Sequence, residues 1–105
     1  MIREGYTITD LADFYDFTHN KWSDRGNNKI TRIIPHHMAG NLTQNQYASI
    51  MHSERQMSAT VSVYTDGTVV AWVPEEKRAW TTGGWEADKC ALTLEIANEV
   101  NKGSD

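Results

Sequence analysis

Two adjacent histidines and one glutamate are the residues of this chain best suited, by type and spacing, to do chemistry. His36 and His37 follow a β-branched run that ends at Pro35, and Glu95 lies within the alternating apolar segment 91–97. An imidazole can ligate a metal or carry a proton, and a carboxylate can take a proton from water. If the two segments are neighbouring strands, one histidine and the glutamate meet at one site.

Strand alternation predicts which histidine faces that site. Successive side chains of a strand point to opposite faces, so His36 shares a face with Ile34 and Arg32, and His37 lies on the other. A buried carboxylate without a partner is costly, so Glu95 is expected to face solvent, a cation or a cleft. We therefore expect His36 to point into the site and His37 to hydrogen-bond locally or pack against a helix.

Each of these residues also has an ordinary structural explanation. A histidine after a proline at a strand end is more often a loop residue than a metal ligand, and a single glutamate is more often a surface group. Cys90, the only cysteine, cannot form an internal disulfide. Its apolar neighbours favour a small buried side chain over a nucleophile. No His-x-x-x-His or Cys-x-x-Cys pair is present, so the local evidence for a metal is weak.

The elements that must position these residues are predicted from periodicity and turn chemistry. Thr43 and Gln46 form a capping-box pair at the start of a helix, and Asp66-Gly67 lies between two β-branched runs, as in a hairpin. Tyr47 belongs to the apolar stripe of that helix. The predicted order is helix 9–17, loop 18–29, strand 30–35, helix 43–54, hairpin 59–64 with 68–73, and strand 91–97. Such a mixture indicates one sheet with helices against it.

Length and composition bound the classes of protein. The 105 residues are enough for a single domain spanning 1–105. The net charge is −4 and the charges are scattered, so no nucleic-acid partner is expected. No apolar stretch is long enough to insert into a membrane, and the N-terminus lacks the apolar core of a secretory signal peptide.

Four segments, in order along residues 28–98, carry a family resemblance: 33–40, 58–63 with 66–69, 73–84 and 91–98. Together they resemble the type 2 N-acetylmuramoyl-L-alanine amidases. That family includes the catalytic domains of phage and prophage endolysins and is related to the peptidoglycan recognition proteins. The resemblance implies an α/β fold with a central mixed β-sheet, flanking helices and a zinc ion in a groove on one face.

The resemblance also implies an activity and assigns residues to it. The chain would be a peptidoglycan hydrolase that cleaves the amide between N-acetylmuramic acid and L-alanine of the stem peptide. His36 matches the first Zn²⁺ ligand, and Glu95 matches the glutamate that orients or deprotonates the zinc-bound water. The remaining ligands are expected beyond residue 105, so the C-terminal part of the domain is expected to be missing. The expected substrate groove is formed by His37, Trp80, Thr82, Gly83 and Gly84.

Departures from the family pattern leave a second hypothesis open. Thr60 and Val61 replace a frequent His-Tyr pair, and Thr81 replaces a histidine. The alternative is therefore a non-catalytic peptidoglycan-binding module with a degenerate or incomplete metal site. A small scaffold domain without a wall ligand is a third hypothesis, but it leaves four ordered segments to chance. An endolysin would act on the bacterial cell wall after release from the host cytoplasm during lysis. Exposed sheet surface is expected to promote self-association.

Overall fold

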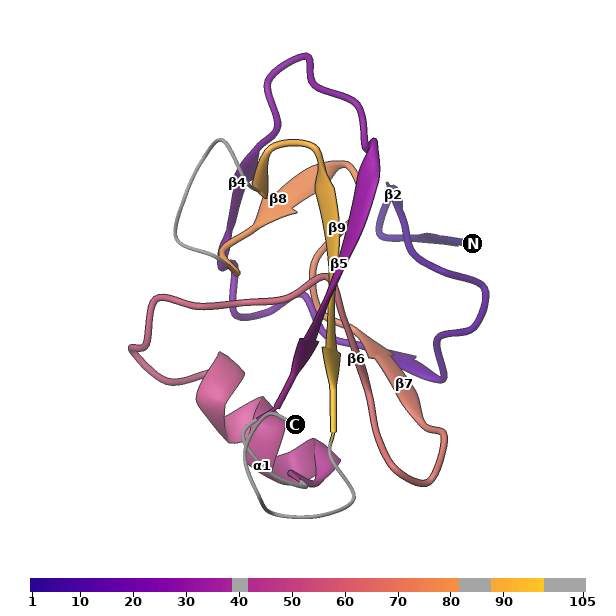
Figure 1. Ribbon diagram of the computed structural model, residues 1–105, viewed down its shortest axis with the longest axis vertical. Helices are drawn as coiled ribbons and strands as arrows, with labels where there is room; N and C mark the ends of the chain where they lie inside the picture. Colours follow the sequence, from indigo (N-terminus) through magenta and orange to yellow (C-terminus); the bar gives the residue numbers. More distant parts are fainter. Residues whose placement is uncertain (39–41, 82–87, 98–105) are drawn as a thin grey trace.

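A five-stranded mixed sheet organises the computed structural model, which describes residues 1–38, 42–81 and 88–97 (Figure 1). The strand order is β3-β7-β6-β9-β5. Its strands are β3 (Phe14–Tyr15), β5 (Arg32–His37), β6 (Val61–Val63), β7 (Val69–Ala71) and β9 (Ala91–Ile96). The β6–β7 pair is antiparallel, whereas β9 is parallel to both β5 and β6. The predicted central mixed sheet is confirmed.

Two smaller two-stranded sheets flank the central one. β1 (Ile2–Arg3) pairs with β2 (Tyr6–Thr7), and β4 (Trp22–Asp24) pairs with β8 (Lys77–Ala79), both antiparallel. The β4 strand lies inside the segment expected to be a loop. Its pairing with a strand more than fifty residues later cannot be inferred from local sequence.

Helix α1 (Gln44–Met51) begins at the predicted capping box. The Thr43 hydroxyl accepts from the Gln46 backbone N–H at 3.2 Å, and the Gln46 side chain accepts from the Thr43 N–H at 2.8 Å. The helix ends at Met51, three residues before the predicted end. Tyr47 and Met51 are buried and pack in one cluster with Trp72 and Val70 of the sheet region.

The predicted hairpin is confirmed, with Val61 opposite Ala71 and Val63 opposite Val69. Gly67 occupies the left-handed region with φ of +88°, which a residue with a side chain adopts only with strain. The Asp66 carboxylate accepts from the Thr68 N–H at 2.9 Å and fixes the turn.

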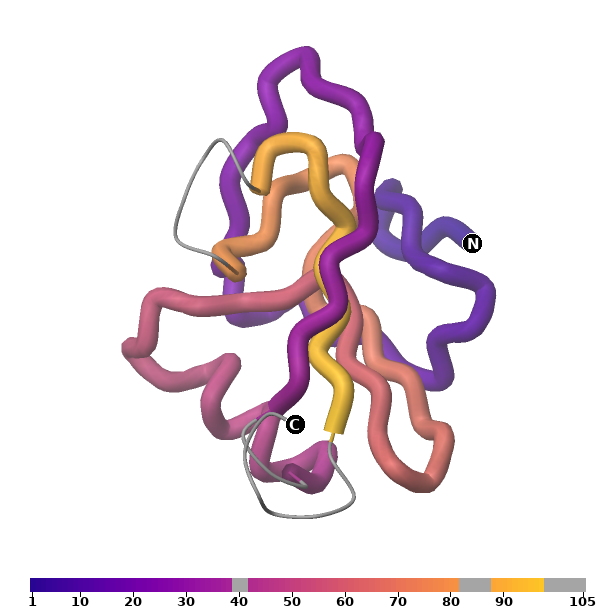
Figure 2. Tube along the Cα trace, in the orientation of Figure 1, coloured from indigo at the N-terminus to yellow at the C-terminus, as the bar shows by residue number. Residues whose placement is uncertain are grey.

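The predicted helix over residues 9–17 is wrong. Phe14 and Tyr15 instead form the edge strand β3, parallel to β7. The ladder is extended by hydrogen bonds from the Asp13 N–H to the Val69 carbonyl and from the Asp16 N–H to the Ala71 carbonyl. Figure 2 shows this N-terminal segment running beside the hairpin. A short helix is marginal on its own, so an open sheet edge outweighs helical periodicity.

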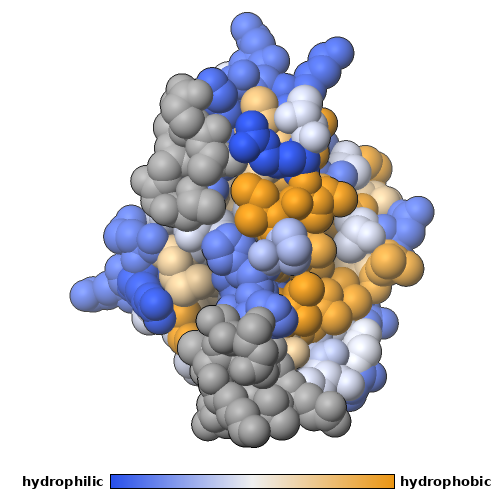
Figure 3. Space-filling model, in the orientation of Figure 1, coloured by the Kyte–Doolittle hydropathy of each residue, from blue (hydrophilic) through white to orange (hydrophobic). Residues whose placement is uncertain are grey.

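The two faces of the central sheet differ in what covers them. On β9, Ala91, Thr93 and Glu95 are buried, whereas the alternate residues Leu92, Leu94 and Ile96 are only half-buried. Ile33 of the neighbouring strand is 64% exposed. Figure 3 shows apolar surface gathered on the side of the molecule where the sheet faces the viewer. Among the described residues, no helix combines the length and apolar character needed to cross a bilayer.

Candidate active site

Parallel pairing of β5 with β9 brings the predicted residues together. The register sets His36 opposite Glu95 and His37 opposite Ile96, near the carboxyl ends of both strands. On its other side Glu95 pairs with Ser62 of β6. Residues opposite each other in a ladder present their side chains to the same face, so the register groups His36, Glu95 and Ser62. The two strands are neighbours, which was the condition for one histidine and Glu95 to meet at one site.

A pocket of about 380 Å³ opens beside Glu95, between α1 and the end of the sheet. Its lining residues are His37, Met38, Leu42, Tyr47, Ile50, Arg55, Met57 and Glu95. The lining includes His37 and does not include His36, which is half-buried. His36 thus shares the ladder position of Glu95, while His37 reaches the pocket at the strand end. Which imidazole meets a ligand stays a prediction.

Glu95 is a buried carboxylate with little to stabilise its charge. Glu95 is only 8% exposed, and its carboxylate accepts no hydrogen bond within the described part of the chain. Burial raises the pKa of the Glu95 carboxyl to about 7, and the positive charge of Arg55 opposes part of that rise. A carboxyl group with a pKa near neutrality can both accept and return a proton in one catalytic cycle.

Tyr47 contributes a second buried polar group to the pocket. The residue is 2% exposed, and its hydroxyl has no hydrogen-bond partner within residues 1–38, 42–81 and 88–97. The ring is held by Trp72, whose centroid lies 5.6 Å away. Burial, with a smaller contribution from Glu95, raises the pKa of the Tyr47 phenol far above its usual value. The hydroxyl therefore stays protonated and is available as a hydrogen-bond donor.

The Trp72 indole is anchored on the buried face by a chain of hydroxyl groups. Its Nε1–H donates to Ser62 Oγ at 2.7 Å, and Ser62 Oγ donates to the Tyr64 hydroxyl at 2.8 Å. Because Ser62 is the ladder partner of Glu95, this network fixes the strand that supports the carboxylate.

The described residues do not complete a zinc site. In that part of the chain no three His, Cys, Asp or Glu side chains converge. His36 and Glu95 supply one imidazole and one carboxylate in register, whereas a catalytic zinc ordinarily takes three protein ligands. The present donor set is therefore insufficient for tight zinc binding by itself.

Trp80, predicted to border the substrate groove, lines a neighbouring hollow with Ser23, Gln56 and Arg78. Its indole N–H donates to Ser23 Oγ at 2.9 Å. Because Arg55 and Met57 line the Glu95 pocket, segment 55–57 lies between the two hollows. Three other predicted groove residues, Thr82, Gly83 and Gly84, lie outside the described residues.

Thr81, which stands where the family often has a histidine, joins a cluster of buried threonines. Its hydroxyl lies 2.8 Å from Thr93 Oγ1 and donates to the Ser58 carbonyl at 2.7 Å. Thr60 Oγ1 lies 3.4 Å from Thr93 Oγ1. These hydroxyl groups join β9 to the segments before β6 and after β8.

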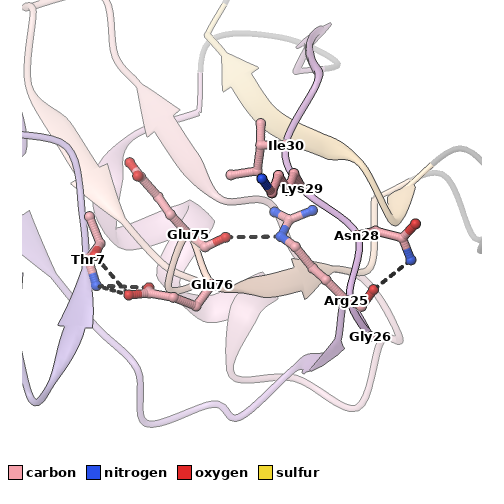
Figure 4. Close-up of a pocket in the computed structure, with 8 residues that line it drawn as sticks. All are labelled: Thr7, Arg25, Gly26, Asn28, Lys29, Ile30, Glu75 and Glu76. Atoms are coloured by element: carbon pink, nitrogen blue, oxygen red, sulfur yellow. Dashed lines mark hydrogen bonds between the residues drawn. The ribbon is translucent and has the colours of Figure 1, made fainter.

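A broader hollow at the opposite end of β5 has a structural explanation (Figure 4). Arg25, which lines it, is 4% exposed and donates to the Glu75, Asp88 and Lys89 carbonyls. Glu76 accepts from the N–H and the hydroxyl of Thr7. These groups tie chain segments together, so the Glu95 pocket is the better candidate site.

The central mixed sheet, with α1 against it, defines the class of the chain as a mixed α/β domain. A family model described as N-acetylmuramoyl-L-alanine amidase (Amidase_2) matches residues 26–105. The chain therefore belongs to the N-acetylmuramoyl-L-alanine amidase family, as the resemblance predicted.

A solved structure supports the fold. The catalytic domain of PlyG, determined in solution, superposes with a TM-score of 0.60 at 17% sequence identity. The match covers 82% of this chain and 53% of that chain, so this chain spans about half the length of the PlyG domain. Among curated proteins, no relative matches.

The sequence alone does not identify two of the pocket residues, Tyr47 and Arg55. The spacing places Tyr47 on the apolar stripe of α1, although a buried tyrosine hydroxyl also needs a hydrogen-bond partner. Arg55 lies just after the predicted helix, and nothing in its local sequence distinguishes it from a surface arginine. Both residues reach the pocket through the packing of α1 on the sheet.

Proposed function

We propose that this chain carries the catalytic glutamate of a peptidoglycan amidase, which cleaves the amide between N-acetylmuramic acid and L-alanine of the stem peptide. The observation that carries the proposal is Glu95, a buried carboxylate paired in register with His36 beside an open pocket. Family membership supports the reaction class. The site of action would be the bacterial cell wall, as for an endolysin released during lysis.

Glu95 has the properties that the proton transfers of amide hydrolysis require. In its ionised form, one carboxylate oxygen accepts a proton from the attacking water, and the same oxygen later returns it to the departing L-alanine nitrogen. A pKa of about 7 makes both transfers accessible near neutral pH. Met38 and Ile50 give the pocket apolar walls beside this oxygen.

The proposal assigns one described residue to zinc. We assign His36 as one ligand, with further ligands outside the described residues, because the described donor set is incomplete. Metal analysis of the purified protein and of its His36→Ala variant tests this assignment. Zinc retained at the same stoichiometry in the variant would contradict it.

Digestion of purified peptidoglycan tests the activity. The amidase reaction releases stem peptides with a free L-alanine amino group, which mass spectrometry identifies. Glu95→Gln keeps the size of the side chain and removes the base, so turnover should fall by about 10²- to 10⁴-fold. Glu54→Gln changes an exposed carboxylate that does not line the pocket and should leave turnover unchanged. Full turnover in the Glu95→Gln variant would contradict the proposed role.

The alternative is a non-catalytic peptidoglycan-binding module, and Thr81, which stands where the family often has a histidine, points to it. This alternative predicts that the protein sediments with purified cell walls and releases no L-alanine amino groups, with or without added Zn²⁺. Release of those amino groups would exclude it.

A further inference from the structure

Arg55 places at the pocket a positive charge that has no salt-bridge partner among the described residues. Its side chain is exposed and lines the same pocket as Glu95 and Tyr47. Within the described part of the chain, its guanidinium forms no salt bridge or hydrogen bond; the influence of Arg55 on the pKa of both neighbours is electrostatic. A guanidinium presents a planar set of N–H donors that fits a carboxylate.

The backbone of Arg55 is held by hydrogen bonds, whereas its guanidinium forms none within the described ranges. Its carbonyl accepts from Lys21 Nζ at 2.5 Å and from the Met57 N–H at 2.9 Å. Its N–H donates to Ser53 Oγ at 3.2 Å. The guanidinium is therefore presented from a held loop, which reduces the entropy lost when it binds a ligand.

The rest of the pocket suits a short peptide. Met38, Leu42, Ile50 and Met57 give apolar walls, and the Tyr47 hydroxyl is a buried donor that has no partner in the part of the chain that the structure describes. The Tyr47 phenol can donate to a peptide carbonyl, and the Arg55 guanidinium can bind a carboxylate. The scissile amide would lie at Glu95, so the carboxylate that Arg55 binds would belong to a ligand residue close to that amide.

We infer that Arg55 recognises the free α-carboxylate of the residue after L-alanine in the stem peptide, and so discriminates D-glutamate from its amide, D-isoglutamine, at that position. This inference rests on the proposed function, because it takes the muramoyl peptide as the ligand. Two extended residues span roughly 7 Å, a length that a 380 Å³ pocket accommodates. The acid carries a negative charge and an acceptor oxygen where the amide carries a neutral NH2 donor, so a guanidinium, which is cationic and only donates, should favour the acid.

Binding of two synthetic ligands tests the inference without requiring turnover. The ligands are N-acetylmuramoyl-L-alanyl-D-glutamate and N-acetylmuramoyl-L-alanyl-D-isoglutamine, titrated into the protein with EDTA present and followed by NMR. The wild type should bind the acid about three- to fivefold more tightly than the amide, as expected for a charge pair at an exposed site. Arg55→Gln should abolish the preference and leave the affinity for the amide unchanged.

Arg32→Gln is the matched control. Arg32 is also exposed but lies at the start of β5, away from the pocket lining, so the preference should persist in this variant. The inference is overturned if the wild type shows no preference, if Arg55→Gln keeps it, if Arg32→Gln loses it equally, or if neither ligand binds. Absence of hydrolysis by a protein that still prefers the acid would count against the proposed function and not against this inference.

Discussion

At the scale of single residues, Glu95 illustrates how a sheet position changes the chemistry of a common side chain. The buried face of β9 otherwise carries Ala91 and Thr93, so the carboxylate loses water without gaining a hydrogen bond in the described part of the chain. Its charged form is therefore disfavoured, and its pKa rises to about 7. Burial of the Glu95 carboxylate destabilises the folded state, and the raised pKa makes the same carboxylate a better general base.

This burial predicts a pH dependence of stability. The folded-state pKa of Glu95, about 7, lies above its usual value of 4.5, so between those pH values the folded state binds more protons than the unfolded state. Stability should therefore fall as pH rises from 4.5 to 7, by at most about 3 kcal/mol. Urea unfolding of metal-free protein at several pH values measures the slope. Glu95→Gln should flatten it, and an unchanged slope in that variant would contradict the burial argument.

A matched pair of tyrosines tests the unpartnered hydroxyl. Tyr47→Phe removes a buried hydroxyl that has no partner within the described residues, so the free energy of unfolding should stay the same or rise by up to about 1 kcal/mol. Tyr64→Phe removes the acceptor of the Ser62 hydroxyl and should cost about 1 kcal/mol. If the Tyr47 hydroxyl donates to substrate, Tyr47→Phe should also lower kcat/KM by about tenfold. Denaturant midpoints and kinetics on one muropeptide separate the two effects, and a destabilised Tyr47→Phe variant would show a missed hydrogen bond.

At the scale of elements, Lys21 connects the end of α1 to the pocket. This buried lysine donates to the Arg55 carbonyl at 2.5 Å and to the Ile50 carbonyl at 3.4 Å. A cation at a helix C-terminus also complements the helix dipole. Lys21→Met retains the apolar stem and loses the ammonium group, so we expect a loss of roughly 2 kcal/mol in the free energy of unfolding.

Lys77→Met is the control for that prediction. Lys77 pairs with Asp24 at 2.6 Å at a more exposed position, so its loss should cost less than about 1 kcal/mol. Urea unfolding of both variants gives the comparison. Equal effects would mean that burial of Lys21 adds nothing to its hydrogen bonds.

The elements also show what local sequence can predict. The start of α1 and the β6–β7 hairpin were predictable because a capping box and an Asp-Gly turn act within a few residues. The pairing of His36 with Glu95 followed from alternation once the two strands were neighbours. Residues 9–17 were mispredicted because β7 offers a sheet edge more than fifty positions away. The contact between Lys21 and the Arg55 carbonyl is likewise formed by residues far apart in the sequence, and no local pattern predicts it.

At the scale of the whole molecule, the unequal faces of the sheet govern solution behaviour. One face is covered by α1, and its side chains are buried. The other carries Ile33, which is 64% exposed, beside the half-buried Leu92, Leu94 and Ile96. The N-terminal segment covers part of this face through Ile8 and Phe17, which pack against Ala71. Among the described residues, β5 and β9 carry the exposed and half-buried apolar side chains of this face.

Association of copies of this chain through the β5–β9 face is the resulting prediction. Burial of one isoleucine contributes about 1.5 to 3 kcal/mol, so a symmetric contact that uses Ile33 twice gains about 3 to 6 kcal/mol, which corresponds to weak association near millimolar protein. Analytical ultracentrifugation should show a concentration-dependent increase in mass, and Ile33→Lys should weaken association at least tenfold, because it places like charges at the contact. Leu11→Lys alters a side chain that is 77% exposed and lies outside the central sheet, and it should leave association unchanged. A wild type that stays monomeric at millimolar concentration, or equal effects of the two lysine variants, would show that this face does not drive association.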